Sequence, residues 1–276
     1  MNIPPIVIWT PPYQEWNGGA VALHKLCHDL NCLGANAAVH IPPYLVDKTV
    51  SPVNPNYNTP LVDEAKRGDV AIYPEIVRGN PLGTNRVARW LLNTPGVIQG
   101  GPTTFSEGDL ILAYQRKFHA TAPLLTAIDF HEGFFRPPPE GTERKGDCYT
   151  IRKGAHKVGA TTLNLSTMDH FEQADFVVMR DLFQRHERFY CFDAMSMIPF
   201  LAALCGCLPI VIPEPGLSKQ EWWSAFPLLS HGIAYGEDDI GRMVSERHRM
   251  ADNMRAVKTD ADASQREFLG RLETWK

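Results

Sequence analysis

Basic side chains gather directly after one apolar segment in the second half of the chain. Arg152, Lys153 and Lys157 follow residues 148–151, which have the composition of a short buried strand. Clustered cations at the end of a strand suit a diphosphate, and arginine adds a planar fork of donors that matches phosphate oxygens. A basic run is also ordinary in a solvated loop, so this run alone leaves both interpretations open.

A second group of polar side chains lies further along the chain. Asp193 directly follows a strand candidate at residues 189–192, and Ser196 is the first residue of an apolar helix expected over residues 196–204. The free amides of a helix start, near Ser196, suit a phosphate, and the Asp193 carboxylate suits the proton of a sugar hydroxyl. The alternative is that Asp193 only caps the helix, which is a common role for aspartate.

Paired glycines occupy the turn between the first predicted strand and the first predicted helix. Gly18 and Gly19 follow Asn17 and precede helical spacing over residues 20–33. Glycine lets a backbone approach a ligand closely, and the helix start offers amides to an anion. The full G-x-G-x-x-G fingerprint and a Walker A loop are both absent. A tight strand-to-helix turn explains the pair equally well.

A metal site is not predicted. His24, His28 and Cys32 fall on one stripe of the first predicted helix, because residues four apart share a face. Zinc requires three or four protein ligands, and no fourth candidate is evident.

The elements that must position these groups alternate between strand and helix. Strands are expected at residues 6–9, 37–41, 69–73, 110–114, 124–128, 148–151, 161–165, 189–192, 209–212 and 233–235. Helices are expected at residues 20–33, 84–92 and 196–204, from a helix start at 166–169, and over the charged stretch from residue 238. Such alternation predicts parallel sheets, whose ligands bind beyond the carboxyl ends of the strands.

Residues 131–147 interrupt this pattern because they are rich in proline, glycine and charge, which is typical of a linker. We therefore expect an α/β chain with two Rossmann-like, doubly wound parallel-sheet domains facing a cleft. The expected boundaries are 1–135 for the N-terminal domain and 146–245 for the C-terminal domain. Helices over 246–276 are expected to pack back on the N-terminal domain.

Composition narrows the functional classes. The 276 residues carry 27 basic and 31 acidic side chains, and a net charge of −4 argues against a protein that coats nucleic acid. Hydrophobic residues make up 44%, which excludes intrinsic disorder. Six scattered cysteines indicate free thiols.

Prolines break the uncharged stretch 194–213, so a helix and a buried strand are expected there rather than a membrane span. The N-terminus lacks signal-peptide features, so we expect a cytoplasmic protein. Trp222 and Trp223 are expected to be either core residues or an exposed contact with a partner or a membrane surface.

The order of these motifs resembles a known superfamily. The Gly18-Gly19 loop, Arg152-Lys153-Gly154, and Asp193-Ala194-Met195-Ser196 leading into Ala-Ala-Leu-Cys-Gly-Cys-Leu-Pro-Ile-Val-Ile-Pro resemble the GT-B glycosyltransferases. The likeness is greatest to small family 4-like (group 1) enzymes and extends over about residues 5–235, with segments 73–81 and 89–96 included. Aligned on the family's glutamate motif, Asp193 replaces the first glutamate. Leu201 replaces the second, which in the family usually contacts the donor ribose.

The resemblance implies metal-independent transfer of a sugar from a nucleotide-diphosphate donor to a hydroxyl of a glycan, polysaccharide or lipid-linked acceptor, without another cofactor. Arg152 with Lys153 or Lys157 would neutralise the diphosphate, and Asp193 would orient the donor sugar, with Ser196 at the donor site. Gly18 and Gly19 would face the phosphates.

The N-terminal half would hold the acceptor. Glu75, at the end of a predicted strand, would be an acceptor ligand or base, or else an exposed loop carboxylate.

Two alternatives remain within the same resemblance. A degenerate GT-B module could bind a nucleotide sugar or a protein partner without catalysis, and Leu201 is the residue that favours it. A GT-B nucleotide-sugar epimerase would require a pair of carboxylates placed for epimerisation.

Overall fold

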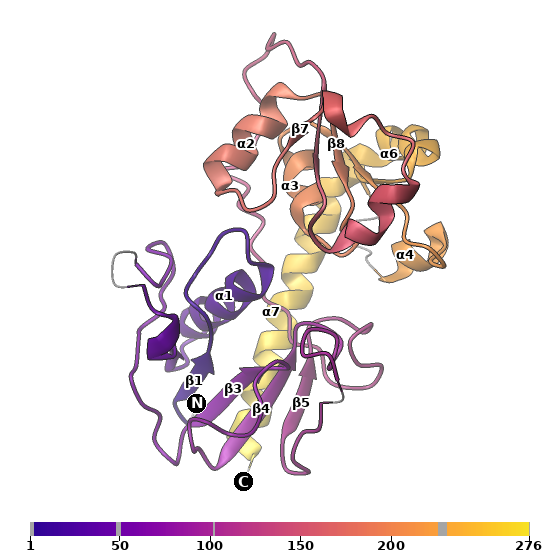
Figure 1. Cartoon of the computed structure of the whole chain (residues 1–276). Coiled ribbons are helices and arrows are strands. Elements are labelled where there is room, and N and C mark those ends of the chain that lie inside the picture. The colour runs from indigo at the N-terminus through magenta and orange to yellow at the C-terminus, as the bar shows by residue number, and fades with distance from the viewer. Residues whose placement is uncertain (1–2, 48–50, 102, 226–230, 276) are drawn as a thin grey trace. The chain divides into compact units, whose positions relative to one another are not determined.

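The chain forms two compact units, each built around a five-stranded parallel sheet (Figure 1). The computed structural model describes residues 3–47, 51–101, 103–225 and 231–275. Unit 1 comprises Met1–Asp129 and Lys258–Lys276, and unit 2 comprises Phe130–Val257. Two parallel sheets with helices confirm the expected α/β fold class.

Both sheets share one strand order. Unit 1 has the order β2-β1-β3-β4-β5, and unit 2 has the order β10-β9-β8-β6-β7. Numbered from the first strand of each unit, both run second, first, third, fourth, fifth, which is a doubly wound order. The direction of winding reverses between β1 and β3 in unit 1 and between β6 and β8 in unit 2. Ligands of such sheets bind beyond the carboxyl ends of the strands at this reversal.

Unit 1 begins with a strand, a capped helix and a second strand. Its elements are β1 (Ile6–Trp9), α1 (Gly18–Cys32), β2 (Ala37–His40), a 3₁₀ turn (Pro43–Leu45), β3 (Val70–Pro74), β4 (Arg86–Leu91) and β5 (Leu110–Ala113). Helix α1 starts where the Asn17 side chain accepts a hydrogen bond from the Ala20 amide at 3.2 Å. It ends before Gly34, whose φ of 88° continues the chain out of the helix.

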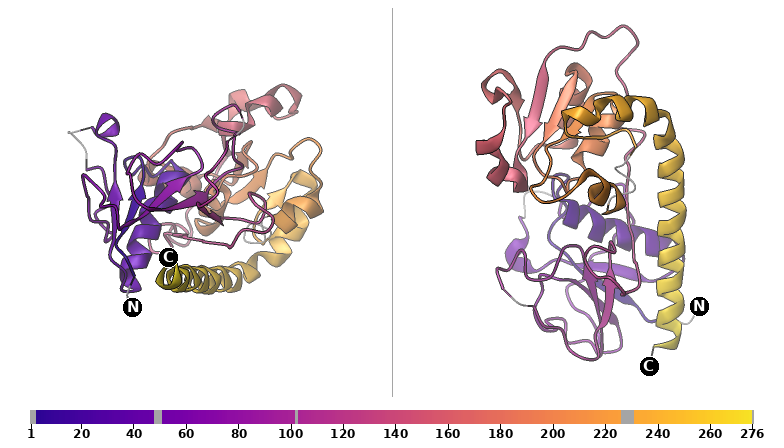
Figure 2. Two further views of the ribbon diagram at one scale, coloured as in Figure 1. Left: turned by 90° about the horizontal axis from the view of Figure 1, so that it is seen from below. Right: turned by 90° about the vertical axis from the view of Figure 1, so that its right-hand side faces the viewer.

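One face of the unit 1 sheet is covered by helices. Leu23, Leu26 and Leu30 of α1 form a core with strand residues such as Ile8. The core is completed by Phe268, Leu269 and Leu272 of α7 (Met250–Thr274), a single continuous helix (Figure 2). The other face carries a smaller cluster around Tyr73 and Val87.

Unit 2 has shorter elements. They are β6 (Asp147–Thr150), 3₁₀ turns at Arg152–Ala160 and Leu165–Thr167, β7 (Asp169–His170), α2 (Phe176–Arg185), β8 (Arg188–Cys191), α3 (Ile198–Leu204), β9 (Leu208–Val211), α4 (Lys219–Ala225), β10 (Ala234–Tyr235), a 3₁₀ turn at Glu237–Asp239, α6 (Ile240–Glu246) and a 3₁₀ turn at Arg247–Arg249. Phe189 of β8 packs against Phe183 of α2, while Tyr190 faces Met243 of α6. Successive residues of the central strand thus bury against opposite layers.

The helix expected at residues 84–92 is wrong, because this segment is strand β4. Val87, Trp90 and Leu91 follow helical spacing, but every residue from Val87 to Leu91 is buried. A central parallel strand is buried on both faces, so its pattern does not alternate and can imitate a helix. Arg89 can be buried in this strand because its Nε lies 2.7 Å from the Asp109 carboxylate, which balances its charge.

Three other expected elements differ in the structure. Residues 124–128 form one bridge, between Ala113 and Leu124, rather than a strand. Residues 161–165 are irregular, and the helix start expected at 166–169 is the end of a 3₁₀ turn followed by β7. The local patterns are too short to decide these segments without their tertiary partners.

The segment expected to be a linker starts inside unit 2. The Phe130 ring lies 5.1 Å from that of Phe200, and the Phe135 ring lies 5.2 Å from that of Phe176, between ring centroids. These aromatic contacts explain why the units divide at Asp129 and Phe130.

The six cysteines are free, and all but Cys32 are buried. None of the helices in the described part of the chain is both long enough and apolar enough to cross a membrane.

Candidate functional site

The candidate site of unit 2 lies where its sheet reverses direction. Strand β6 ends at Thr150 and runs into Arg152, and strand β8 ends at Cys191 and runs into Asp193. These two strands are neighbours, with Thr150 opposite Cys191. The sheet therefore places Arg152 and Asp193 side by side, and the Arg152 Nε lies 4.0 Å from Oδ2 of Asp193.

A left-handed backbone turns Arg152 out of the strand. Its φ is 47°, a conformation that costs a non-glycine residue free energy and persists only where the surroundings impose it. Glu172 supplies that constraint. Its carboxylate accepts hydrogen bonds from the amides of Ile151 at 2.7 Å and of Arg152 at 2.9 Å.

Glu172 is the residue of this site that the sequence did not reveal. Burial pushes the pKa of Glu172 upward, but hydrogen bonds from the Ile151 amide, the His170 ring and the Arg152 amide outweigh it, so the pKa lies below its ordinary value. The group is therefore a carboxylate near neutral pH. The sequence signal was weak, because Glu172 lies 20 residues from Arg152 and bonds its backbone rather than its side chain.

Gly154 brings the basic loop against the end of β8. A Cβ atom at this position would lie 2.1 Å from the carbonyl oxygen of Phe192, far inside contact distance. Glycine is therefore needed here for close backbone packing, which holds the loop after β6 next to the residue that precedes Asp193.

Asp193 is buried and also shapes the chain that follows it. Its side chain is 6% exposed, and its Oδ1 accepts a hydrogen bond from the Met195 amide at 3.0 Å. The Ser196 amide donates to the Asp193 carbonyl, and the Ser196 hydroxyl accepts from the Ile198 amide at 3.2 Å. Three amides at this helix start thus have acceptors within the chain. A phosphate near Ser196 would have to use other donors.

The three cations of the basic run have different surroundings. Lys153 is exposed and the Arg152 side chain is 22% exposed, whereas Lys157 is buried. The Lys157 ammonium donates to the carbonyl of Ile212 at 2.8 Å and lies 3.2 Å from Glu214. Lys157 therefore joins two loops, and the cations that solvent can reach are Arg152 and Lys153.

Glu214 is held from both sides. The His156 ring nitrogen lies 2.6 Å from its Oε1. Burial would raise the pKa of Glu214, but hydrogen bonds from His156 and Lys157 outweigh it and leave the pKa below its ordinary value. The Glu214 amide donates to the Tyr235 hydroxyl at 2.8 Å, which fixes the loop after β9.

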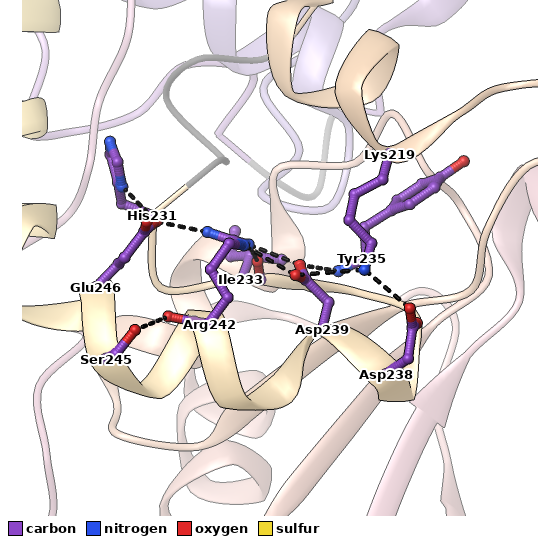
Figure 3. Close-up of polar contacts among 9 residues, drawn as sticks. All are labelled: Lys219, His231, Ile233, Tyr235, Asp238, Asp239, Arg242, Ser245 and Glu246. Carbon is purple, nitrogen blue, oxygen red and sulfur yellow. Dashed lines mark hydrogen bonds and ion pairs between the residues drawn. The ribbon is translucent and has the colours of Figure 1, made fainter.

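A network of charged side chains supports Tyr235 in turn (Figure 3). The Asp239 carboxylate accepts the Tyr235 amide at 3.0 Å and the Arg242 guanidinium at 2.7 Å. Burial raises the pKa of Asp239, but these bonds outweigh it and the pKa is lowered. Lys219 of α4 lies 2.9 Å from Asp238, which ties α4 to the start of α6. This network is structural, and it supports the residue whose hydroxyl accepts the Glu214 amide.

In unit 1, Gly18 and Gly19 form the first turn of α1. Within the described chain, no atom comes within 4 Å of a Cβ built at Gly18. At Gly19 the nearest, Asn17 Oδ1, lies at an ordinary 3.5 Å. Internal packing therefore does not require glycine at either position.

Glu75 follows β3 at the corresponding reversal in unit 1. It is only 2% exposed, so the expectation that Glu75 is an exposed loop carboxylate is wrong. Its Oε2 accepts the Leu92 amide at 2.9 Å, and its backbone carbonyl accepts the Gln99 side chain at 2.9 Å.

The histidines of α1 have structural partners. His24 is buried with a ring nitrogen 3.0 Å from the Pro11 carbonyl, and burial lowers its pKa below the ordinary value. The His28 ring stacks on Tyr57. Over the residues that the structure covers, no three His, Cys, Asp or Glu side chains are grouped to hold a metal ion.

Comparison with known proteins gives structural likeness only. No family model matches the sequence, and no curated protein matches it. Among solved structures, phage T4 β-glucosyltransferase is similar with a TM-score of 0.44 at 9% identity, covering 98% of this chain and 97% of that one. An α-glucosyltransferase solved with UDP and DNA has a TM-score of 0.44 at 12% identity, covering 96% and 94%. The glycosyltransferase SnogD from Streptomyces nogalater has a TM-score of 0.42 at 12% identity, covering 99% and 95%. The activity of this chain is therefore argued from its own residues.

Proposed function

We propose that this protein is a GT-B-type glycosyltransferase that moves a sugar from a nucleotide-diphosphate donor to an acceptor hydroxyl. The observation that carries the proposal is the pairing of Arg152 with Asp193 at the reversal point of the unit 2 sheet, 4.0 Å apart. A cation and a carboxylate at this edge match the two ends of a sugar diphosphate, which are an anion and a set of hydroxyls.

The reaction makes defined demands on these groups. The bond from the anomeric carbon to the diphosphate oxygen breaks, and its electron pair stays on the diphosphate. The acceptor oxygen forms the new glycosidic bond, and its proton passes to a base. Stabilising the charge that develops on the leaving group is often the largest catalytic contribution. We assign this role to Arg152 with Lys153, acting without a metal ion.

The remaining expected residues take roles that fit their surroundings. Asp193 orients the donor sugar through the lone pairs that Met195 leaves available. Ser196 contributes a hydroxyl rather than a free helix-start amide. Lys157 and Glu214 hold the loops that frame the site, so Lys157 acts on the diphosphate only through this support.

We assign the acceptor to unit 1. Glu75 is a candidate acceptor ligand or base, since its carboxylate sits at the end of β3. Gly18 and Gly19 are candidates for close approach to a phosphate, because glycine lets the backbone come near a ligand and both residues lie in the first turn of α1.

One observation favours a second function. Leu201 is buried in α3, and the resemblance aligns it with the family's second glutamate, which usually contacts the donor ribose. A chain without that contact could bind a nucleotide sugar without transferring it.

A panel of UDP, GDP, ADP and TDP in thermal denaturation tests donor binding, because a ligand of the folded state raises the melting temperature. The binding nucleotide is then supplied as its sugar conjugate, and release of sugar is measured with and without acceptors. A shift followed by transfer or hydrolysis supports the glycosyltransferase. A shift without turnover supports the binding module, and no shift with any nucleotide contradicts both.

A further inference from the structure

Unit 1 contains a pocket that the donor site does not involve. It has a volume of about 510 Å³ and lies beyond the carboxyl ends of three strands. Trp9 is the last residue of β1, His40 is the last of β2, and residues 76–78 follow β3. This is the reversal point of the unit 1 sheet, where ligands of such sheets bind, and the volume is that of a small-molecule site.

A buried cation holds one wall of this pocket in place. Arg89 is 2% exposed and lies under the loop after β3, where its guanidinium donates to the carbonyls of Val77 and Gly79. The Val77 bond is 3.0 Å long, and the ion pair with Asp109 balances the charge. A buried charge that loses its hydrogen-bond partners costs much free energy. The bonds from Arg89 to the two carbonyls therefore hold this loop in place.

Neutral hydrogen bonds fix the same loop further along. The Tyr73 hydroxyl donates to Asn80 Oδ1 at 2.8 Å and accepts the Leu82 amide at 2.8 Å. The Asn80 side chain also donates to the Thr84 carbonyl. A wall held at residues 77, 79, 80 and 82 is preorganised, which reduces the entropy lost when a ligand binds.

The lining favours a flat apolar ligand. Trp9 and Tyr44 supply aromatic rings, and Ile76 and Val77 supply aliphatic groups. Prolines 42, 43 and 81 also line the pocket. Tyr44 is 80% exposed and Ile76 is 37% exposed, so large apolar groups face solvent at the rim. Rings and prolines present flat faces on which another ring can stack.

The charge of the lining favours an anion. Arg78 is exposed and lines the pocket, and none of the described lining residues is acidic. The guanidinium fork binds carboxylate and phosphate oxygens in pairs. Trp9, His40 and Tyr44 add hydrogen-bonding groups to the lining, and Arg78 is its arginine.

We propose that this pocket binds an aromatic acid, with its ring packed on Trp9 and Tyr44 and its carboxylate on Arg78. The proposal rests on the proposed function in one respect: a hydroxyl on this acid would be the acceptor. This acceptor class differs from the glycan, polysaccharide or lipid-linked acceptor expected from the sequence.

The test measures dissociation constants by calorimetry on the whole chain. Hydroxynaphthoate is the probe, with hydroxynaphthamide as the neutral analogue and hydroxycyclohexanecarboxylate as the analogue that is not flat. We expect saturable binding of hydroxynaphthoate and about ten-fold weaker binding of each analogue. A nucleoside monophosphate and a maltooligosaccharide complete the panel, and tighter binding of either that Arg78→Gln weakens and Arg152→Ala leaves unchanged would overturn the aromatic acid as occupant.

Variants locate the binding. Arg78→Gln should weaken hydroxynaphthoate about ten-fold and leave the neutral amide unchanged, whereas Tyr44→Ala should weaken both. The control is Arg67→Gln, which removes an exposed arginine of the same unit outside the pocket lining. Equal effects of Arg78→Gln and Arg67→Gln, or no saturable binding, would overturn the proposal.

A further variant separates this proposal from the proposed function. Arg152→Ala changes unit 2, so it should leave hydroxynaphthoate binding unchanged even if it abolishes nucleotide binding. If no nucleotide binds but hydroxynaphthoate does, the pocket stands and the glycosyltransferase fails. If both bind and no sugar is transferred to hydroxynaphthoate, the acceptor role is overturned.

Discussion

Glu172 holds the backbone of Arg152, with its carboxylate accepting the Arg152 amide at 2.9 Å and the preceding amide at 2.7 Å. The two residues belong to adjacent strand ends, because β7 pairs with β6. Both hydrogen bonds are made by backbone amides. Glu172 therefore orients the guanidinium that we assign to the diphosphate by fixing the backbone that carries it.

This relationship predicts that Glu172 is a positioning residue. Glu172→Ala should weaken nucleotide binding about ten-fold, because the left-handed conformation at Arg152 loses its support. Glu172→Gln keeps one acceptor oxygen and should recover part of the affinity. The dissociation constant is measured on folded protein, with Glu140→Ala, an exposed site in the same unit, as the control. A lowered melting temperature with unchanged affinity would show that Glu172 only stabilises the fold.

Gly154 should not tolerate a side chain. Gly154→Ala places a Cβ 2.1 Å from the Phe192 carbonyl oxygen, so the loop or the strand end must move. We expect unit 2 to lose roughly 3 kcal/mol of unfolding free energy in denaturant titration, at the upper end of overpacking costs. Gly159→Ala is the matched control in the same 3₁₀ segment, where no described atom lies within 4 Å. Equal stability of the two variants would contradict the close approach.

The neighbouring lysines should separate stability from binding. Lys157→Met leaves the Ile212 carbonyl without its donor and should cost about 1–3 kcal/mol of unfolding free energy. Lys153→Met changes an exposed side chain and should weaken nucleotide binding with little effect on stability. Denaturant unfolding and calorimetric titration of both variants check the pair. The reverse result would return Lys157 to the donor site and remove Lys153 from it.

These assignments show how far the sequence reaches. Strand β1 and helix α1 follow from local pattern, because an apolar run, an asparagine cap and a terminal glycine specify them. Strand β4 does not, because burial on both faces removes the alternation that identifies a strand. Within the basic run, lysines 153 and 157 look alike in sequence. Only the tertiary structure buries Lys157 against Ile212.

Acid should destabilise unit 2 through its paired carboxylates. The pKa values of Glu172 and Glu214 are below their ordinary value of 4.5, because hydrogen bonds to the ionised form outweigh burial. Their contribution to stability is therefore complete above pH 4.5 and is lost as the pH falls through the lowered values. Melting temperatures between about pH 6 and pH 3 should fall, and less steeply in Glu214→Gln. Parallel curves for the two proteins would contradict the role of Glu214.

Direct titration of the nucleotide that gives the largest thermal shift tests the central claim, which is that Arg152 and Asp193 form a donor site. Calorimetry is carried out on the wild-type chain, on Arg152→Ala and on the control Arg185→Ala, whose side chain is 63% exposed and pairs with Asp169. We predict at least ten-fold weaker binding in Arg152→Ala and unchanged binding in Arg185→Ala. Equal affinity of wild-type protein and Arg152→Ala would contradict the account.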